Sequence, residues 1–150
     1  MSANRIRPSE LFAIIGNIDP DAYANAVYET AWMDVESWGS VAAIIEAGTL
    51  GSSATIDAKF QSNTIGSDSG AGDVTGAAIT QLNQAGTDSD KQAIIQVNVD
   101  KLTQGHKFMK LIVTVGAAAC DMSAVVLGFH PRYAPASDWD KATVDEIVSV

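Results

Sequence analysis

The chain has 150 residues, of which 47% are hydrophobic, and it carries 9 Lys and Arg against 18 Asp and Glu. This length and apolar content suit one domain with one core and argue against global disorder. The formal charge of −9 argues against nucleic-acid and membrane partners, because binding to phosphate needs clustered Lys and Arg.

The single cysteine, Cys120, cannot form an intrachain disulfide, which fits folding in a reducing compartment. The first ten residues, MSANRIRPSE, lack the apolar segment of a signal peptide. The apolar run Leu11–Ile15 is too short to span a bilayer. We therefore expect a soluble protein made in the cytoplasm.

Residues 1–21 are predicted to form an N-terminal arm. Pro8 and Pro20 bracket the apolar run LFAII, which contains Leu11 and Phe12. This run fits either a short helix, with Ser9 as its N-cap, or an edge strand. Docking on a neighbouring subunit and folding back onto the chain's own sandwich both remain open.

The segment from Tyr23 to Asp34 mixes helical and alternating spacing, and its end favours a strand over Glu29–Val35 with Trp32 in the core. Trp38–Gly39 is interpreted as a turn. A strand is then predicted over Val41–Ala47, since Gly48 and Gly51 follow after one strand's length.

The cleanest alternation in the chain is Ala54–Gln61, with Ile56, Ala58 and Phe60 predicted to face the core. The following segment, Ser62–Thr75, is rich in Gly, Ser and Asp and is predicted to be an exposed, mobile loop. Two further strands are predicted over Ala77–Leu82 and Gln92–Val99.

The stretch Lys107–Val115, KFMKLIVTV, alternates with period two and is largely apolar on both faces. This pattern predicts a central strand covered on both sides. The linker Gly116–Met122 has the length and the glycine of a hairpin connection to a second strand, Ser123–Phe129. Pro131 and Pro135 then favour an extended segment.

These segments amount to about seven or eight short strands with no helix of crossover length between them, which indicates an all-β fold. We predict a jelly-roll-like antiparallel β-sandwich over residues 22–135, with extended N- and C-terminal arms over residues 1–21 and 136–150.

The sequence contains no constellation that points to a reaction. His106 and His130 lie near no GxSxG, HExxH or paired Cys/His motif. The loop with Asp68, Ser69 and Asp73 offers hard oxygen ligands for calcium, but it lacks the EF-hand order, so a flexible surface loop is favoured. We predict no catalytic residue, no metal, no cofactor and no enzymatic activity.

Aromatic and apolar residues outside the predicted core are candidates for an interface with another chain. Trp139 lies in the tail, where its burial requires a partner. The predicted interface residues are Leu11, Phe12, Trp38, Tyr133 and Trp139.

The order GTLGSSATIDAKFQ, DVTGAAITQL, QAIIQVNVDKL, KFMKLIVTVG and SAVVLGFHPRYAP, over roughly Trp32 to Pro135, resembles small virion proteins of tailed bacteriophages described as head decoration or cement proteins. The resemblance implies a subunit, often a homotrimer, that is made in the host cytoplasm, binds the major capsid protein on the outside of the head and bridges adjacent capsomers. The alternatives are a carbohydrate-binding β-sandwich module and a neck or tail component of the same virion.

Overall fold

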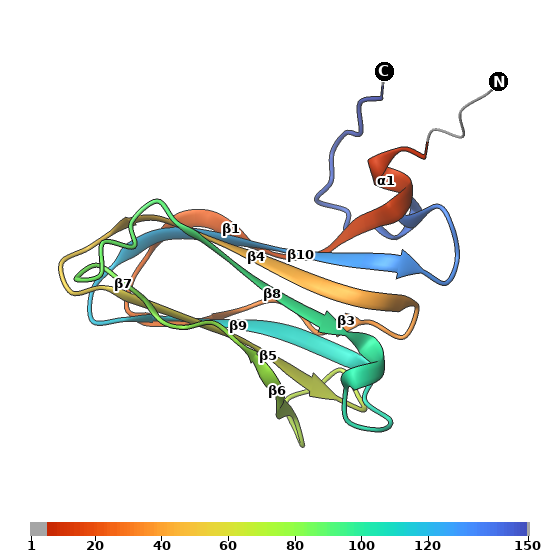
Figure 1. Ribbon diagram of the computed structural model, residues 1–150, viewed down its shortest axis with the longest axis horizontal. Coiled ribbons are helices and arrows are strands. Elements are labelled where there is room, and N and C mark those ends of the chain that lie inside the picture. Colours follow the sequence, from red (N-terminus) through yellow and green to blue (C-terminus); the bar gives the residue numbers. More distant parts are fainter. Residues whose placement is uncertain (1–5, 150) are drawn as a thin grey trace.

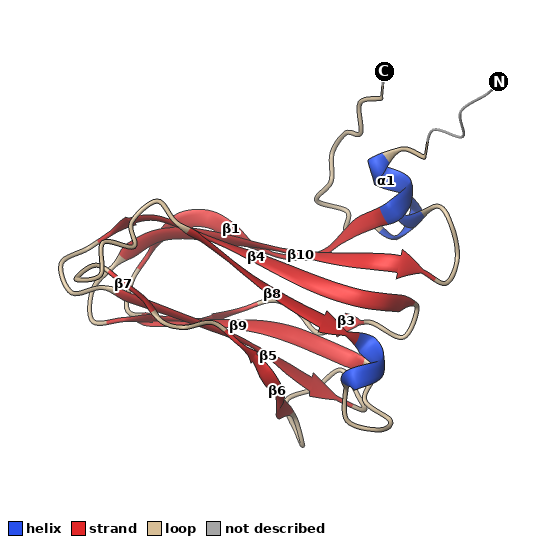
Figure 2. Ribbon diagram, in the orientation of Figure 1, coloured by secondary structure: helices blue, strands red, loops and turns tan. Residues whose placement is uncertain are grey.

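The computed structural model describes residues 6–149, which form two antiparallel β-sheets packed face to face (Figure 1). Sheet A has the strand order β1-β10-β4-β8. Sheet B has the order β2-β9-β5-β6, with β3 beside β9 and β7 beside β5. The helical segments are short and lie at the edges of the sandwich (Figure 2). The predicted all-β antiparallel sandwich is confirmed. Within residues 6–149, no helix has the length and apolarity needed to cross a membrane.

The elements follow one another in this order: α1 Pro8–Leu11, β1 Phe12–Tyr23, β2 Ala26–Glu29, β3 Met33–Asp34, β4 Trp38–Leu50, β5 Thr55–Asn63, β6 Gly72–Ala78, β7 Leu82–Asn83, β8 Gln92–Asn98, the 3-10 turn η1 Val99–Lys101, β9 Phe108–Gly116, β10 Cys120–Pro131 and the 3-10 turn η2 Ala136–Trp139.

The long strands pair in a nested order: strands near the two ends of the sequence pair with each other, and strands closer to its middle pair in turn. Strand β1 pairs with β10, β2 with β9, β4 with β8, and β5 with β6. Most successive long strands also change sheet along the chain. This nested pairing across two packed sheets is the jelly-roll arrangement.

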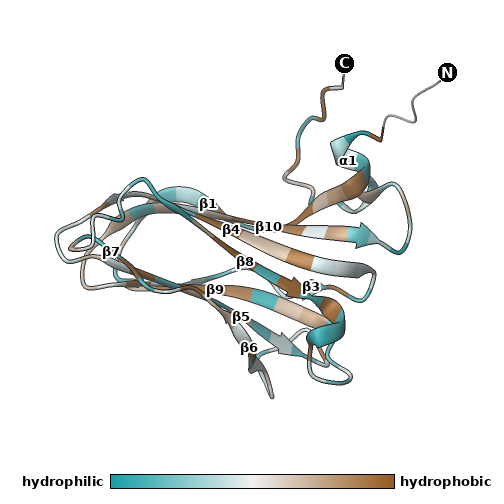
Figure 3. Ribbon diagram, viewed as in Figure 1, coloured by the Kyte–Doolittle hydropathy of each residue, from teal (hydrophilic) through white to brown (hydrophobic). Residues whose placement is uncertain are grey.

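Alternating side chains fill the space between the sheets. In β5 and β9 every second residue is buried, and the buried set includes Ile56, Ala58 and Phe60, as predicted. Figure 3 shows the matching hydropathy pattern, with brown segments in the strands and teal or white segments in most loops. Strand β9 lies between β5 on one side and β2 and β3 on the other. Leu111 and Val113 are fully buried there, so the central position of this strand is confirmed. The predicted cover on both sides is wrong, because Ile112 and Thr114 lie on the outer face of sheet B and remain partly exposed.

The predicted hairpin between the last two long strands is wrong. Strand β9 belongs to sheet B and β10 to sheet A, so the linker crosses from one sheet to the other. The short linker and its glycine fit a sheet-to-sheet crossing as well as a hairpin. Alternating apolar residues on both strands do not specify which sheet each strand joins.

The predicted boundary of an N-terminal arm at residue 21 is wrong for Phe12–Asp21. These residues lie in β1, which pairs with β10 from Phe12 opposite Phe129 to Tyr23 opposite Cys120. Register shifts between Ile14 and Gly16 and between Ile18 and Asp21 interrupt the alternation, which hides the strand in the sequence. The segment folds back onto its own sandwich, one of the two placements left open.

The C-terminal segment begins beside β1, which is an edge strand of sheet A. The turn η2 packs against α1 and β1. The backbone N–H of Lys141 donates to the carbonyl of Ile14 at 2.8 Å, and the Asp140 carboxylate accepts from the N–H of Ile14 at 2.6 Å. Residues 142–149 contain no helix or strand, and for them the predicted arm stays a prediction.

Two tryptophans differ from their predicted positions. Trp38 begins β4 instead of forming a turn, and it is 6% exposed. Trp32 lies outside the core between β2 and β3, partly exposed, with the Lys110 ammonium 5.1 Å from its ring centre. The dipeptide Trp-Gly is typical of a turn, but Gly39 here sits in an extended strand against His130, where an added Cβ would come within 2.9 Å.

Candidate interaction surfaces

Each of the two histidines lies within hydrogen-bonding distance of a serine hydroxyl. Ser62 Oγ lies 2.8 Å from His106 Nδ1, and Ser40 Oγ lies 3.2 Å from His130 Nδ1. Ser62 is 2% exposed, so its hydroxyl cannot reach a substrate. Within residues 6–149 no carboxylate hydrogen-bonds to either ring. These pairs therefore fix local structure and do not form a triad.

Two carboxylates of the loop considered for calcium, Asp68 and Asp73, bond to lysines of the protein itself. Lys110 Nζ bonds the Asp68 carboxylate, which also accepts from Trp32 Nε1 at 3.0 Å. Asp73 accepts from Lys59 Nζ at 2.8 Å. These hydrogen bonds, from Lys110 first and then Trp32, lower the pKa of Asp68, and the bond from Lys59 contributes most to the lowered pKa of Asp73. Within the described part of the chain, no group of His, Cys, Asp and Glu residues is arranged to hold a metal.

The buried Lys110 bonds to the loop between β5 and β6. The predicted loop Ser62–Thr75 is shorter than expected, because β5 extends to Asn63 and β6 begins at Gly72. The side chain of Lys110 is 5% exposed, and its ammonium also bonds Glu29 at 2.8 Å. Burial acts to lower the pKa of Lys110, but hydrogen bonds with Asp68 and Glu29 outweigh it and raise the pKa. The buried amide of Asn63 donates to the carbonyls of Ser67 and Ser69.

Cys120 is also placed for structure and not for reactivity. It is 3% exposed at the start of β10. Burial, and then the charge of Asp121, raises the pKa of its thiol. A thiol held neutral in the core is a poor nucleophile.

Exposed apolar side chains gather at one end of the sandwich. Nine large hydrophobic residues are exposed within residues 6–149. Six of them belong to α1 and the two residues before it, to the connection after β10 that includes η2, and to the C-terminal segment. Figure 1 shows these three segments at the end where both termini lie. We call this set the terminal surface: Ile6, Leu11, Tyr133, Trp139, Ile147 and Val148.

The terminal surface includes a groove of about 410 Å³ between the C-terminal segment and the start of β1. Phe12 and Ile14 line one side of the groove, and Val144 and Ile147 line the other. The first turn of α1 is closed by the N–H of Arg7, which donates to the Glu10 carboxylate at 2.7 Å. A defined backbone thus presents apolar side chains to solvent, as docking surfaces do.

The outer face of sheet A is a second apolar surface. Residues on this face lie side by side in register, because Phe12 pairs with Phe129 and Ile14 with Leu127. The next row joins Val125, Ile44 and Ile94 across three strands. The eight apolar residues of the face are Phe12, Ile14, Ala42, Ile44, Ile94, Val125, Leu127 and Phe129.

The outer face of sheet B has the opposite character. Lys59 and Asp73 form an ion pair of 2.8 Å there, and Asp57 accepts a hydrogen bond from Gln81. The Lys110 cluster covers another part of this face. Sheet B therefore presents water mainly with paired charges and polar groups, beside the apolar residues Val27 and Ile112. Sheet A presents water mainly with side chains that water solvates poorly.

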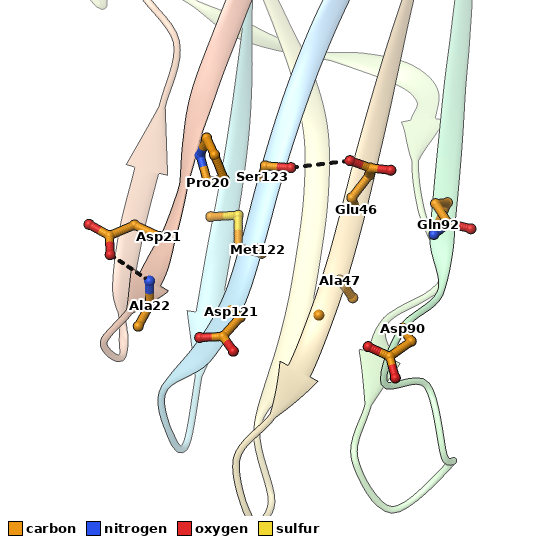
Figure 4. A pocket seen from close by; sticks show the side chains of 11 residues that line it. Pro20, Asp21, Ala22, Glu46, Ala47, Asp90, Gln92, Asp121, Met122 and Ser123 are labelled. Carbon is orange, nitrogen blue, oxygen red and sulfur yellow. Dashed lines mark hydrogen bonds between the residues drawn. The ribbon is translucent and has the colours of Figure 1, made fainter.

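Acidic residues collect at the end of sheet A that lies farthest from the terminal surface. A depression of about 540 Å³ is lined there by Asp21, Glu46, Asp90 and Asp121, with no Lys, Arg or His among its lining residues (Figure 4). Glu46 accepts from Ser123 Oγ at 3.4 Å. None of the four carboxylates forms an ion pair with any residue from 6 to 149.

Four of the five predicted interface residues retain accessible surface. Leu11, Tyr133 and Trp139 lie on the terminal surface, and Phe12 joins it to the outer face of sheet A, with its ring centre 5.9 Å from that of Phe129. Trp38 is the exception, because its ring is buried in the chain's own core.

Sequence reasoning missed the outer face of sheet A and the exposed pair Ile147 and Val148. The signal for the face is the uninterrupted apolar composition of VAAII (41–45) and AVVLGF (124–129), in which the outward positions Ala42, Ile44, Val125, Leu127 and Phe129 are as apolar as the inward ones. A solvated antiparallel face would show polar residues at alternate positions.

No protein-family model matches the chain. A search of curated proteins also finds no match. Among solved structures, a chain from infectious bursal disease virus strain Gt matches with 12% identity and a TM-score of 0.45, over 83% of this chain and 33% of that chain. A chain from strain Gx of the same virus matches with 13% identity and a TM-score of 0.44, over 91% of this chain and 40% of that chain. This chain thus spans well under half the length of either.

Proposed function

We propose that this protein is a structural subunit of a bacteriophage virion, a decoration or cement protein. It binds the major capsid protein on the outer surface of the head and bridges adjacent capsomers. It performs no enzymatic step, and its attachment energy comes from apolar surface buried against the shell. The sequence resemblance to small head proteins of tailed phages supports the type of particle.

The terminal surface is the observation that carries this proposal. Six of the nine exposed large hydrophobic residues belong to segments at this end, around Trp139 and Leu11. Aromatic and aliphatic anchors of this kind contribute most where a partner buries them completely. Repeated copies on a symmetric shell multiply weak single contacts into stable attachment.

A binding assay with particles that lack this protein tests the proposal. Purified protein is added to such particles and sedimented with them. We expect saturable binding at a fixed number of copies per capsomer. The double variant Leu11→Ser, Trp139→Ser should bind at least tenfold more weakly, because it removes two exposed anchors and leaves the core unchanged.

The matched control is Val27→Ser, Ile65→Ser. These residues are 59% and 55% exposed, and neither belongs to the terminal surface. The control should bind like the unmodified protein. Lack of co-sedimentation by the unmodified protein, or equal binding by both double variants, would rule out attachment through the terminal surface. The copy number at saturation also measures whether the subunit attaches as the homotrimer that the resemblance implies.

A further inference from the structure

We infer that the outer face of sheet A is a second docking surface, for a different protein whose apolar patch is bordered by Lys or Arg. This rests on the proposed function, because a subunit that bridges two capsomers needs a contact surface for each. The two surfaces meet at Phe12 and Ile14, which line the groove of the terminal surface and also lie on the outer face of sheet A. On that proposal the partner is a shell protein next to the one held by the terminal surface.

The centre of this surface carries no charge. Three successive rows of outward-facing residues cross the sheet, and all eight apolar residues of the face lie in them. The other members of these rows are Asn17, Ser40, Gln96 and Asn98. Ile94 is 59% exposed at the centre of β8. An apolar sheet face of this kind is a site of protein contact when it lies on the surface.

The next row carries the charge that selects the partner. It joins Ser123, Glu46 and Gln92, and the remaining carboxylates of the acidic depression lie around it (Figure 4). Four carboxylates in one depression, with no lysine or arginine among its lining residues, give this part of the surface a negative charge that a cationic group from a partner would neutralise. A partner with Lys or Arg beside its apolar patch is therefore complementary to both parts of the surface.

A second copy of this chain fits the surface poorly. The chain has twice as many acidic as basic residues. Four of its lysines already pair with its own carboxylates. Arg7, Arg132 and Lys141 lie at the opposite end, among Glu10, Asp138 and Asp140. The one other cation of residues 6–149 is Lys107, whose ammonium lies 6.0 Å from the centre of the Phe108 ring. Within that range, no cationic patch free of carboxylates is left that could meet the acidic depression of another copy.

The area of the face indicates how it acts. Four strands about 4.8 Å apart and three rows about 6.8 Å apart give a footprint of roughly 400 Å². This is about half of the ~800 Å² per partner that a stable complex buries. The face alone therefore gives weak binding, and it becomes effective when the terminal surface is already attached to the same particle.

The experiment uses the full chain and particles that lack it, with two variants of this face. Ile44→Ser, Ile94→Ser removes an apolar cross-strand pair, and Glu46→Gln, Asp90→Asn removes two charges. We expect the first variant to bind at least fivefold more weakly while it still saturates through the terminal surface. The second should bind more weakly at 50 mM salt and lose most of the salt dependence of the unmodified protein.

Two control variants carry the same kinds of substitution at positions outside the outer face of sheet A. Val27→Ser, Ile65→Ser removes the same kind of exposed apolar surface, and Glu36→Gln, Asp57→Asn removes two charges. Both should bind like the unmodified protein at every salt concentration. Far-UV circular dichroism and thermal melts of all variants verify that each one folds.

The outcomes separate the two proposals. If the unmodified protein does not bind, the proposed function fails and this inference fails with it. If it binds, and the variants of the sheet A face behave like their controls, only the second docking surface is ruled out. A last experiment measures the sedimentation velocity of the free protein. Self-association that Ile44→Ser, Ile94→Ser abolishes would make the occupant a second copy and overturn the inference.

Discussion

The indole ring of Trp38 lies flat against the backbone of Gly128, where an added Cβ would come within 2.5 Å of the ring. The two residues belong to neighbouring strands of sheet A, β4 and β10. A glycine is needed at position 128 because the buried indole ring of Trp38 occupies the space that a side chain there would fill. The contact fixes the start of β4 in the core.

The variant Gly128→Ala should lose about 1–3 kcal/mol in free energy of unfolding, as expected for overpacking of a filled core. Urea melts followed by tryptophan fluorescence measure this loss. Gly72→Ala is the control, because an added Cβ at Gly72 meets nothing within 4 Å. Equal stability of the two variants would mean that Trp38 does not pack as described.

Leu111→Ala should lose roughly 2–4 kcal/mol, because Leu111 is fully buried at the centre of β9 and the change leaves a cavity. Denaturant melts measure the loss. The exposed residue Val27, on the neighbouring strand β2, provides a comparison, and Val27→Ala should change stability by less than about 0.5 kcal/mol. A loss that small for Leu111→Ala would contradict a central β9.

Lys110→Met should release the loop at residues 64–71 and leave the sandwich folded. The methionine can occupy the buried stem position, but Asp68 loses its cation and the indole loses its cation–π contact. We expect amide hydrogen exchange in Ser67–Gly70 to speed up at least tenfold. Lys59→Met, which removes an exposed cation from the same sheet face, should leave the exchange of those amides unchanged. Unchanged exchange in Lys110→Met would show that other contacts hold the loop.

Stability should fall as the pH drops below about 4. Hydrogen bonds lower the pKa of Asp68, Asp73 and Asp88 below the ordinary value of 3.8. A carboxyl with a lowered folded-state pKa contributes stability that is present above its unfolded pKa and lost as pH falls through its folded value. Lys110 affects stability only at alkaline pH, because its pKa in the folded protein is raised above the ordinary value of 10.5. The stability that its charge contributes is fully present below pH 10.5 and is lost as the pH rises through the folded-state pKa. Thermal melts from pH 2 to pH 7 should show a decline confined to the acid end, and Asp68→Asn should flatten it.

Two truncations separate the arm from the sandwich. Removal of residues 142–150 should leave the melting temperature within a few degrees, because the bonds from Asp140 and Lys141 to Ile14 remain. It should weaken attachment to particles, since Ile147 and Val148 are lost. Removal of residues 1–21 should unfold the protein, because it deletes most of β1 and uncovers β10. A folded monomer without residues 1–21 would contradict the pairing of β1 with β10.

The sequence was sufficient for the strands whose alternation is regular. The pattern of Ile56, Ala58 and Phe60 predicted β5, and KFMKLIVTV predicted the central strand, because each inward residue recurs at every second position. It left the run LFAII open between a short helix and an edge strand, and it did not predict the full length of β1, where two register shifts and Pro20 interrupt the pattern. Nor could it assign β9 and β10 to separate sheets, since pairing between distant strands leaves no local signal.

The surfaces could be predicted only in part. Leu11, Tyr133 and Trp139 were recognisable as apolar residues in segments outside the regular strands. Trp38 was misassigned because its burial depends on the empty space at Gly128, 90 positions further along the chain. The burial of Lys110 likewise depends on carboxylates from β2 and from a distant loop.

Imaging the particle that carries this protein, at a resolution that resolves strands, tests the central claim most directly. We expect the sandwich on the outside of the head, with the terminal surface on one capsomer and the outer face of sheet A on the next. The charged face of sheet B should point into solvent. A particle in which sheet B contacts the shell, or in which the protein occurs only at the neck or tail, would contradict the account.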